Sequence, residues 1–151
     1  MSLASGIFNV RIYGLLINEQ QEILIAEEFR YNTFIRKFPG GGLVFGESPI
    51  EAVKREFREE LSIEIDIIRH FYTTDFFVQS AFNAQQQVIS IYYLVKTNDV
   101  INEKYFRLKN LNELKEGDEQ FINIALSELI PDYFTFPIEK KVCELLLSEF
   151  T

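Results

Sequence analysis

Residues 41–63 read GGLVFGESPIEAVKREFREELSI, and they contain the strongest structural signals in the chain. Ser48, Pro49 and Glu51 form a typical helix start, because the Ser hydroxyl caps free backbone N–H groups and Glu51 completes a capping box. We therefore expect a helix that begins after Ser48 and ends near Leu61. The apolar residues within it recur at helical spacing and predict one buried face: Ile50, Val53, Phe57 and Leu61.

The same helix carries a cluster of acidic residues. Glu56, Glu59 and Glu60 stand at positions i, i+3 and i+4, so their side chains are neighbours on one helix surface. At about 100° per residue their mean direction lies away from the apolar face, so these side chains can point into a cleft beside the core. Hard divalent cations prefer clustered carboxylate oxygens, and Mg²⁺ also shares the phosphate oxygens of its substrates. The cluster therefore indicates a Mg²⁺ site, although a solvated acidic helix face has the same charge pattern.

The spacing of this segment resembles the Nudix box, G-x5-E-x7-R-E-U-x-E-E-x-G-U, where U is a bulky aliphatic residue. Two positions differ from that pattern. Phe57 stands where an aliphatic residue is usual, and Ser62 replaces the Gly that ends the helix in a left-handed conformation. The residues that match the box are Gly41, Glu47, Arg55, Glu56, Glu59, Glu60 and Ile63.

The resemblance implies a Nudix hydrolase of the MutT-like type, with an α/β/α sandwich around a mixed sheet and one domain over residues 1–151. Such enzymes hydrolyse a diphosphate bond between a nucleoside phosphate and another moiety. Mg²⁺ or Mn²⁺ would be held by glutamates and by a backbone carbonyl of the Gly-rich segment, and Arg55 would orient the glutamates. Glu47 would belong to the same network. The implied metal ligands are Gly41, Glu56, Glu59 and Glu60.

The general base is left open between two regions of the chain. Glu59 and Glu60 are the nearest carboxylates within the box. Family members also recruit a base from a later loop, and here the acidic loop contains Glu116, Asp118 and Glu119. We select Glu119 from that loop because it directly precedes a predicted strand.

The segments outside the box predict a mixed α+β fold. Residues 7–17 and 22–29 are rich in β-branched and aromatic residues and are expected to pair as a hairpin. Residues 40–42 read as a flexible Gly stretch, followed by an extended piece at 43–45. Further strands are expected at 34–38, 88–96 and 120–125, and a closing amphipathic helix at 138–150.

The substrate cannot be named from the box, because the leaving moiety must be contacted elsewhere. A nucleoside triphosphate and a nucleotide-sugar type of diphosphate fit equally well. Aromatic side chains near the Gly-rich segment and near the polar loop at 80–86 are candidates to stack on a base. These candidates are Tyr31, Phe34, Phe76, Phe77 and Phe82.

Composition restricts the partners and the compartment. The 15 basic and 23 acidic side chains give a net charge of −8, which disfavours binding to nucleic-acid polymers or to anionic membranes. No apolar run is long enough for a transmembrane helix. The single Cys143 favours a reducing, cytoplasmic setting and is expected to be a buried apolar residue. A homodimer and the origin of Met1-Ser2-Leu3 are left open.

Two other functions share the implied fold. A Nudix-fold ligand sensor would bind without catalysis, but intact glutamates and the lack of a second domain argue against it. Isopentenyl-diphosphate isomerase uses a Cys and extra metal ligands. A lone Cys143 on a predicted C-terminal helix does not provide them.

Overall fold

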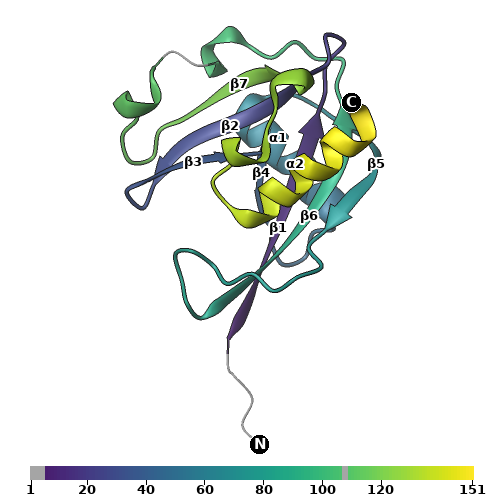
Figure 1. Cartoon of the computed structure of the whole chain (residues 1–151). Helices are drawn as coiled ribbons and strands as arrows, with labels where there is room; N and C mark the ends of the chain where they lie inside the picture. Colours follow the sequence, from purple (N-terminus) through teal and green to yellow (C-terminus); the bar gives the residue numbers. More distant parts are fainter. Residues whose placement is uncertain (1–5, 107–108) are drawn as a thin grey trace, which may run out of the picture.

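The structure is a computed structural model that describes residues 6–106 and 109–151, and within these residues two β-sheets combine with two α-helices (Figure 1). The strands are β1 (Ile7–Leu16), β2 (Glu22–Arg30), β3 (Thr33–Lys37), β4 (Gly40–Gly42), β5 (Asp66–Thr73), β6 (Gln86–Lys96) and β7 (Glu119–Ala125). The helices are α1 (Pro49–Leu61) and α2 (Pro137–Phe150). None of the described helices has the length and apolar character needed to cross a membrane.

The larger sheet is mixed and the smaller sheet is antiparallel. The larger one has the order β4-β1-β6-β5, in which β1 and β6 are parallel and the two outer pairs are antiparallel. The smaller one has the order β3-β2-β7. Parallel neighbours need a long crossover connection, and α1 lies within the connection between β1 and β6.

Both faces of the sheets are covered, so neighbouring residues along a strand enter different cores. Tyr13 packs in the core that contains Val142 of α2, whereas Ile12 packs in the core that contains Phe57 of α1. Figure 1 shows the corresponding layers, with α2 in front of the strands and α1 behind them. This arrangement confirms the predicted α+β class and the α/β/α sandwich with a mixed sheet.

The hairpin predicted for residues 7–17 and 22–29 does not form. The chain turns between these strands, but they join different sheets, and they are linked near the turn by the bridge between Ile17 and Ile23. A strand has two hydrogen-bonding edges. Those of β1 are occupied by β4 and β6, and those of β2 by β3 and β7.

The Gly-rich segment also differs from the prediction. Residues 40–42, expected to be a flexible stretch, form β4, and Gly41 lies opposite Ile12 of β1. The extended piece predicted at 43–45 is not part of a strand. The edge of β1 explains the difference, because its backbone N–H and C=O groups form hydrogen bonds with residues 40–42 and hold them in an extended conformation.

Helix α1 begins and ends as predicted. The Ser48 hydroxyl accepts a hydrogen bond from the Glu51 N–H at 3.1 Å, and Ser62 adopts the left-handed conformation with φ 56° and ψ 37°. The predicted apolar face is wrong at one position, since Ile50 lies in the first turn with 42% of its surface exposed. Ala52 is buried there instead, and Cys143 is buried in the other core as predicted.

Candidate active site

Arg55 is the centre of an ionic network at the start of the cleft. Its guanidinium donates to both Glu47 oxygens at 2.7 and 2.9 Å, to Glu56 at 3.0 Å and to Glu59 at 3.2 Å. A further bond of 3.0 Å reaches the carbonyl oxygen of Gly42, so the helix is tied to β4. The hydrogen bonds from Arg55 lower the pKa of Glu47 to about 2. The network predicted for Arg55 and Glu47 is therefore present.

Glu56 is held against the backbone of β4 at Gly41. A Cβ atom placed on Gly41 would lie 2.5 Å from Glu56 Oε1 and 2.7 Å from its Cδ, which is far inside van der Waals contact. A Cβ atom at this position would therefore force the Glu56 carboxylate to move. The Gly pairing with β1 and the helical position of Glu56 thus bring a carboxylate and a strand backbone into direct contact.

A second group of charged residues lies next to Glu60. Glu28 and Glu119 are cross-strand partners in the β2–β7 pair, and their carboxyl groups share a hydrogen bond. The Lys37 ammonium lies 3.4 Å from Glu28 Oε1, and Lys37 as a residue is 8% exposed. Glu60 has a buried carboxyl oxygen, Oε2, without a hydrogen-bond partner. This atom is an acceptor that faces other acids, so a bound cation or a proton would stabilise it.

The carboxyl groups of Glu28, Glu60 and Glu119 have different pKa values. Burial and then the charge of Glu119 raise the pKa of Glu60 to about 9. Burial and then the hydrogen bond with Glu28 raise the pKa of Glu119 to about 7. Burial alone would raise the pKa of Glu28, but Lys37, the bond from Glu119 and Arg30 together lower it. The three carboxyl groups therefore hold protons with different affinities in a small volume.

These acids open into one cleft of about 1080 Å³. That volume lies just above the usual range of about 300–1,000 Å³ for small-molecule sites. Its lining extends from Glu56, Glu59 and Glu60 on α1, past β4, to the start of α2 and to the segment 78–83. The acids predicted from the box and the later Glu119 are thus brought together, while the side chain of Glu59 is 58% exposed at the rim.

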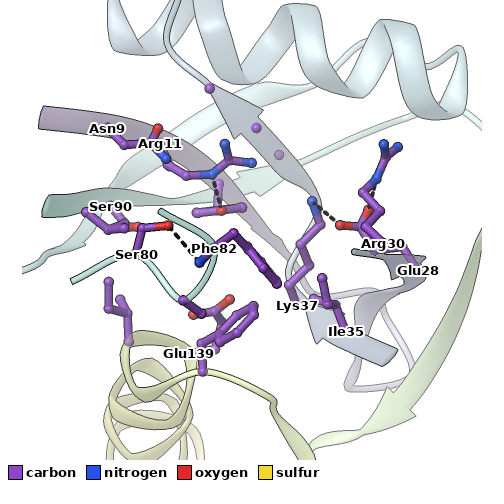
Figure 2. A pocket seen from close by; sticks show the side chains of 18 of the residues that line it. Asn9, Arg11, Glu28, Arg30, Ile35, Lys37, Ser80, Phe82, Ser90 and Glu139 are labelled. Atoms are coloured by element: carbon purple, nitrogen blue, oxygen red, sulfur yellow. Dashed lines mark hydrogen bonds and ion pairs between the residues drawn. The ribbon is translucent and has the colours of Figure 1, made fainter. Parts of the chain in front are cut away.

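The other end of the cleft is polar and is built by strands and by α2. In Figure 2, Arg11, Lys37 and Glu139 line the same hollow from β1, β3 and α2, respectively. Arg11 Nε donates to the Tyr13 hydroxyl at 2.7 Å. Glu139 is 5% exposed, and Ser90 of β6 is 2% exposed beside the same space. Two cations, the buried Lys37 and the half-buried Arg11, therefore face the cleft that the acids line.

The candidate aromatic residues separate into two groups. Tyr31 and Phe82 line the cleft, and their ring centroids lie 4.6 Å apart. Phe34, Phe76 and Phe77 are not part of the cleft lining. The Phe34 ring instead packs against Phe29, at 4.8 Å between centroids.

Several cleft residues escaped the reasoning from sequence. Three of them are charged residues within apolar strands: Arg11, Glu28 and Lys37. In a strand that is buried on both faces, a charged side chain has few favourable positions other than a cleft. Glu139 shares the helical stripe of Val142, Cys143 and Leu146, all fully buried. An acidic residue within an otherwise apolar helical stripe was the sequence signal that could have identified Glu139 as a cleft residue. The missed residues are Asn9, Arg11, Glu28, Lys37, Ser90 and Glu139.

Comparison with known proteins identifies the family of this arrangement. A family model described as NUDIX domain matches residues 8–124. A MutT protein from Methanosarcina mazei Go1 superposes with a TM-score of 0.71 and 19% identity, over 99% of this chain and 100% of that one. The ORF135 protein of E. coli gives a TM-score of 0.69 and 17% identity, over 98% and 94% of the two chains. At these identities the superpositions establish the fold.

One curated relative matches a shorter part of the chain. An RNA pyrophosphohydrolase of Acinetobacter baylyi is 39% identical over 56 residues, which are 37% of this chain and 32% of that protein. The match therefore spans about a third of the length of that relative.

Proposed function

The chain belongs to the NUDIX domain family, and we propose that it is a metal-dependent hydrolase of a diphosphate bond between a nucleoside phosphate and another moiety. The observation that carries this proposal is one cleft that holds the box glutamates together with two cations, the buried Lys37 and the half-buried Arg11. A diphosphate is an anion that needs both a hard metal ion and positive side chains to be bound and attacked. Glu60, Lys37 and Arg11 line the cleft together.

The residues present fit a hard divalent cation, Mg²⁺ or Mn²⁺. All four proposed ligands offer oxygen, namely the carboxylates of Glu56, Glu59 and Glu60 and the carbonyl of Gly41. Glu60 has a buried oxygen without a partner, and Gly41 leaves room for Glu56 against the strand. Among residues 6–106 and 109–151, no group of three or more His, Cys, Asp or Glu side chains is already arranged to hold a metal ion. Arg55 holds two of the proposed carboxylate ligands, Glu56 and Glu59. When bound, such an ion neutralises phosphate charge and makes a water more acidic.

The cations of the cleft bind and orient the substrate. Lys37 and Arg11 come from neighbouring parts of β3 and β1, and both contact the Tyr13 ring, at 6.0 and 5.8 Å from its centroid. Their charges offset those of the two phosphates in a site where little water screens them. Arg55 acts as a positioning residue, because its bonds fix Glu56 and Glu59 on the helix.

The proton of the attacking water passes to a carboxylate. Glu119 is our choice of general base, because it lines the same cleft as the glutamates of α1, and because burial and Glu28 raise its pKa to about 7, which suits a group that takes up a proton near neutral pH. Glu59 and Glu60 are the alternatives within the box. A base within reach of the water contributes about 10²–10⁴-fold to the rate.

The moiety beyond the diphosphate is contacted outside the box. Tyr31 and Phe82 offer ring faces in the cleft, and base–aromatic stacking contributes about 1–3 kcal/mol per ring. A nucleoside triphosphate and a nucleotide sugar are both consistent with this lining. The Acinetobacter relative is named an RNA pyrophosphohydrolase, which adds an RNA that carries a diphosphate bond as a third candidate substrate. We expect Phe82→Ala to weaken substrate binding while it preserves metal affinity.

The competing functions have less support. An isomerase of isopentenyl diphosphate needs a Cys at the reaction centre, but Cys143 is fully buried in the core with α2. A non-catalytic sensor would not need an acceptor such as Glu60 Oε2 kept buried and unpaired, because that state costs stability.

The decisive experiment is a panel of diphosphate compounds assayed with Mg²⁺ and with excess chelator. The panel contains nucleoside triphosphates, nucleotide sugars, dinucleoside polyphosphates and a 5′-triphosphorylated RNA. We expect hydrolysis that stops in chelator and that falls at least about 10²-fold in Glu60→Gln. Glu51→Gln is the matched control, since Glu51 is an exposed acid in the first turn of the same helix. Full activity in chelator, or equal activity of the two variants, would refute the proposal.

A further inference from the structure

The turn between β2 and β3 holds two residues in a conformation that side chains rarely adopt. Arg30 and Thr33 are cross-strand partners, so the loop between them consists of Tyr31 and Asn32, with φ values of 52° and 57°. Positive φ at both loop residues is the requirement of a type I′ hairpin turn, which Asn-Gly sequences favour. An aromatic residue is unfavourable there, because its Cβ approaches the following carbonyl oxygen. Such a conformation persists only when the surrounding structure holds it.

The acidic loop before β7 supplies this support. The Tyr31 N–H donates to one carboxylate oxygen of Glu116 at 3.0 Å, and the Asn32 N–H donates to the other at 3.2 Å. Hydrogen bonds to a carboxylate are stronger than those to a neutral acceptor. The loop is itself fixed to the end of β2, because the Gly117 N–H donates to the Phe29 carbonyl oxygen at 2.8 Å. Figure 1 shows the loop beside the turn.

The Tyr31 ring is the part of the turn that reaches the cleft. Tyr31 is 70% exposed, so burial in a core does not determine where its ring lies. The ring nevertheless lines the cleft, with its centroid 4.6 Å from that of Phe82 in a different segment. Glu116 is not part of the cleft lining. The backbone conformation of the turn therefore decides the position of the ring, and Glu116 acts on the cleft only through that turn.

We propose that Glu116 is a positioning residue of the substrate site, because it holds the Tyr31–Asn32 turn and thereby keeps the Tyr31 ring in the cleft wall beside Phe82. This inference rests on the proposed function, in which Tyr31 offers a ring face to the base of the substrate. Without the carboxylate, water would bind the two N–H groups and would favour no single turn conformation. The ring would then leave the wall, and the substrate would bind more weakly.

The first measurement follows the ring directly. The sequence contains no Trp, so Tyr31→Trp introduces a single indole whose fluorescence anisotropy reports its nanosecond mobility. In this background Glu116→Ala should lower the anisotropy of the unliganded protein. Glu113→Ala is the matched control and should leave the anisotropy unchanged. Glu113 is an exposed acid of the same loop, and it accepts a hydrogen bond from Asn110 in its own segment.

A rescue variant separates the hold on the turn from any effect of the negative charge on the cleft. Gly adopts positive φ readily, so Asn32→Gly makes the turn less dependent on Glu116. Added to Glu116→Ala, it should restore both the anisotropy and KM, whereas an effect of charge would not be restored. Glu116→Gln keeps one acceptor oxygen and should give an intermediate result. It also serves as the test variant should Glu116→Ala fail to fold.

The second measurement is KM and kcat with the member of the diphosphate panel that the wild-type protein hydrolyses fastest. Complete loss of one stacking contact corresponds to about 5–140-fold in affinity. Glu116→Ala keeps the ring but not its position, so we expect a smaller rise in KM of about threefold or more, with kcat within about twofold. Glu113→Ala should change neither constant by more than about twofold.

Two results would overturn the inference: an unchanged anisotropy in Glu116→Ala, or a lowered anisotropy with KM within about threefold of wild type. A loss confined to kcat belongs to the second result and would place Glu116 in the chemistry instead. Because the anisotropy is measured without substrate, it tests the hold on Tyr31 whether or not the panel is hydrolysed. The absence of metal-dependent hydrolysis refutes the proposed function, whereas normal hydrolysis with an unchanged anisotropy refutes only the role of Glu116.

Discussion

Gly41→Ala tests whether the close contact between β4 and α1 positions a catalytic carboxylate. The added Cβ would lie 2.5 Å from Glu56 Oε1, whereas ordinary contact begins at 3.4 Å, so the carboxyl group must move by about 0.9 Å. A displacement of about 1 Å in an active site lowers the rate by about 10²-fold. We therefore expect kcat/KM for diphosphate hydrolysis to fall about 100-fold in Gly41→Ala, together with weaker Mg²⁺ affinity.

The fold should tolerate this substitution. Gly41 is not among the described residues with positive φ, so Ala adopts its backbone conformation without strain. The change in activity is measured by steady-state kinetics over a Mg²⁺ titration, and thermal unfolding shows whether the variant is folded.

Gly42→Ala is the matched control one residue along the same strand. A Cβ there would meet only Arg11 Nη1, at an ordinary 3.7 Å, so we expect a loss of no more than about threefold. Gly41→Ala activity within threefold of wild type, or equal losses in both variants, would refute the assigned role of the contact between Gly41 and Glu56.

Three further predictions concern charge and backbone conformation. Lys37→Met should move the acidic limb of the pH–rate profile to higher pH, because the ammonium that lowers the pKa of the proposed base Glu119 is lost; an unmoved limb would contradict this. Ser62→Gly should stabilise the protein by about 0.5–1 kcal/mol in chemical denaturation, since Ser62 has φ 56°. Both proteins in this comparison carry Tyr105→Phe, which removes the 2.9 Å hydrogen bond between the Ser62 and Tyr105 hydroxyl groups. A loss of stability in the Gly variant would show that the backbone strain at Ser62 is negligible. Burial raises the pKa of Glu139, so the wild-type protein loses stability as pH rises from about 4.5 to about 7. Glu139→Gln should therefore unfold at the same temperature as wild type near pH 4 and be more stable by about 3 kcal/mol at pH 8, and a gap that does not grow with pH would contradict the burial argument.

Local signals in the sequence were sufficient for the central helix and its acids. Ser48 caps α1 through a bond three residues away, and Ser62 ends it in the left-handed conformation. Glu56 and Glu60 share one side of the helix because helical geometry alone sets their spacing. The strands at 88–96 and 120–125 were likewise predicted from β-branched and apolar patterns, which depend on neighbours only a few residues away.

Tertiary structure decided how the strands pair and which residues complete the cleft. The pairing of β1 with β4 and β6, rather than with β2, depends on edges supplied by segments far along the chain. Glu28 meets Glu119 through the β2–β7 register, across 91 positions of sequence. Glu139 enters the cleft because α2 packs on the core face of Tyr13. Short-range geometry determines a helix and its caps, whereas the distance between two strands or helices depends on the packing of the whole chain, so only the folded structure brought these side chains together.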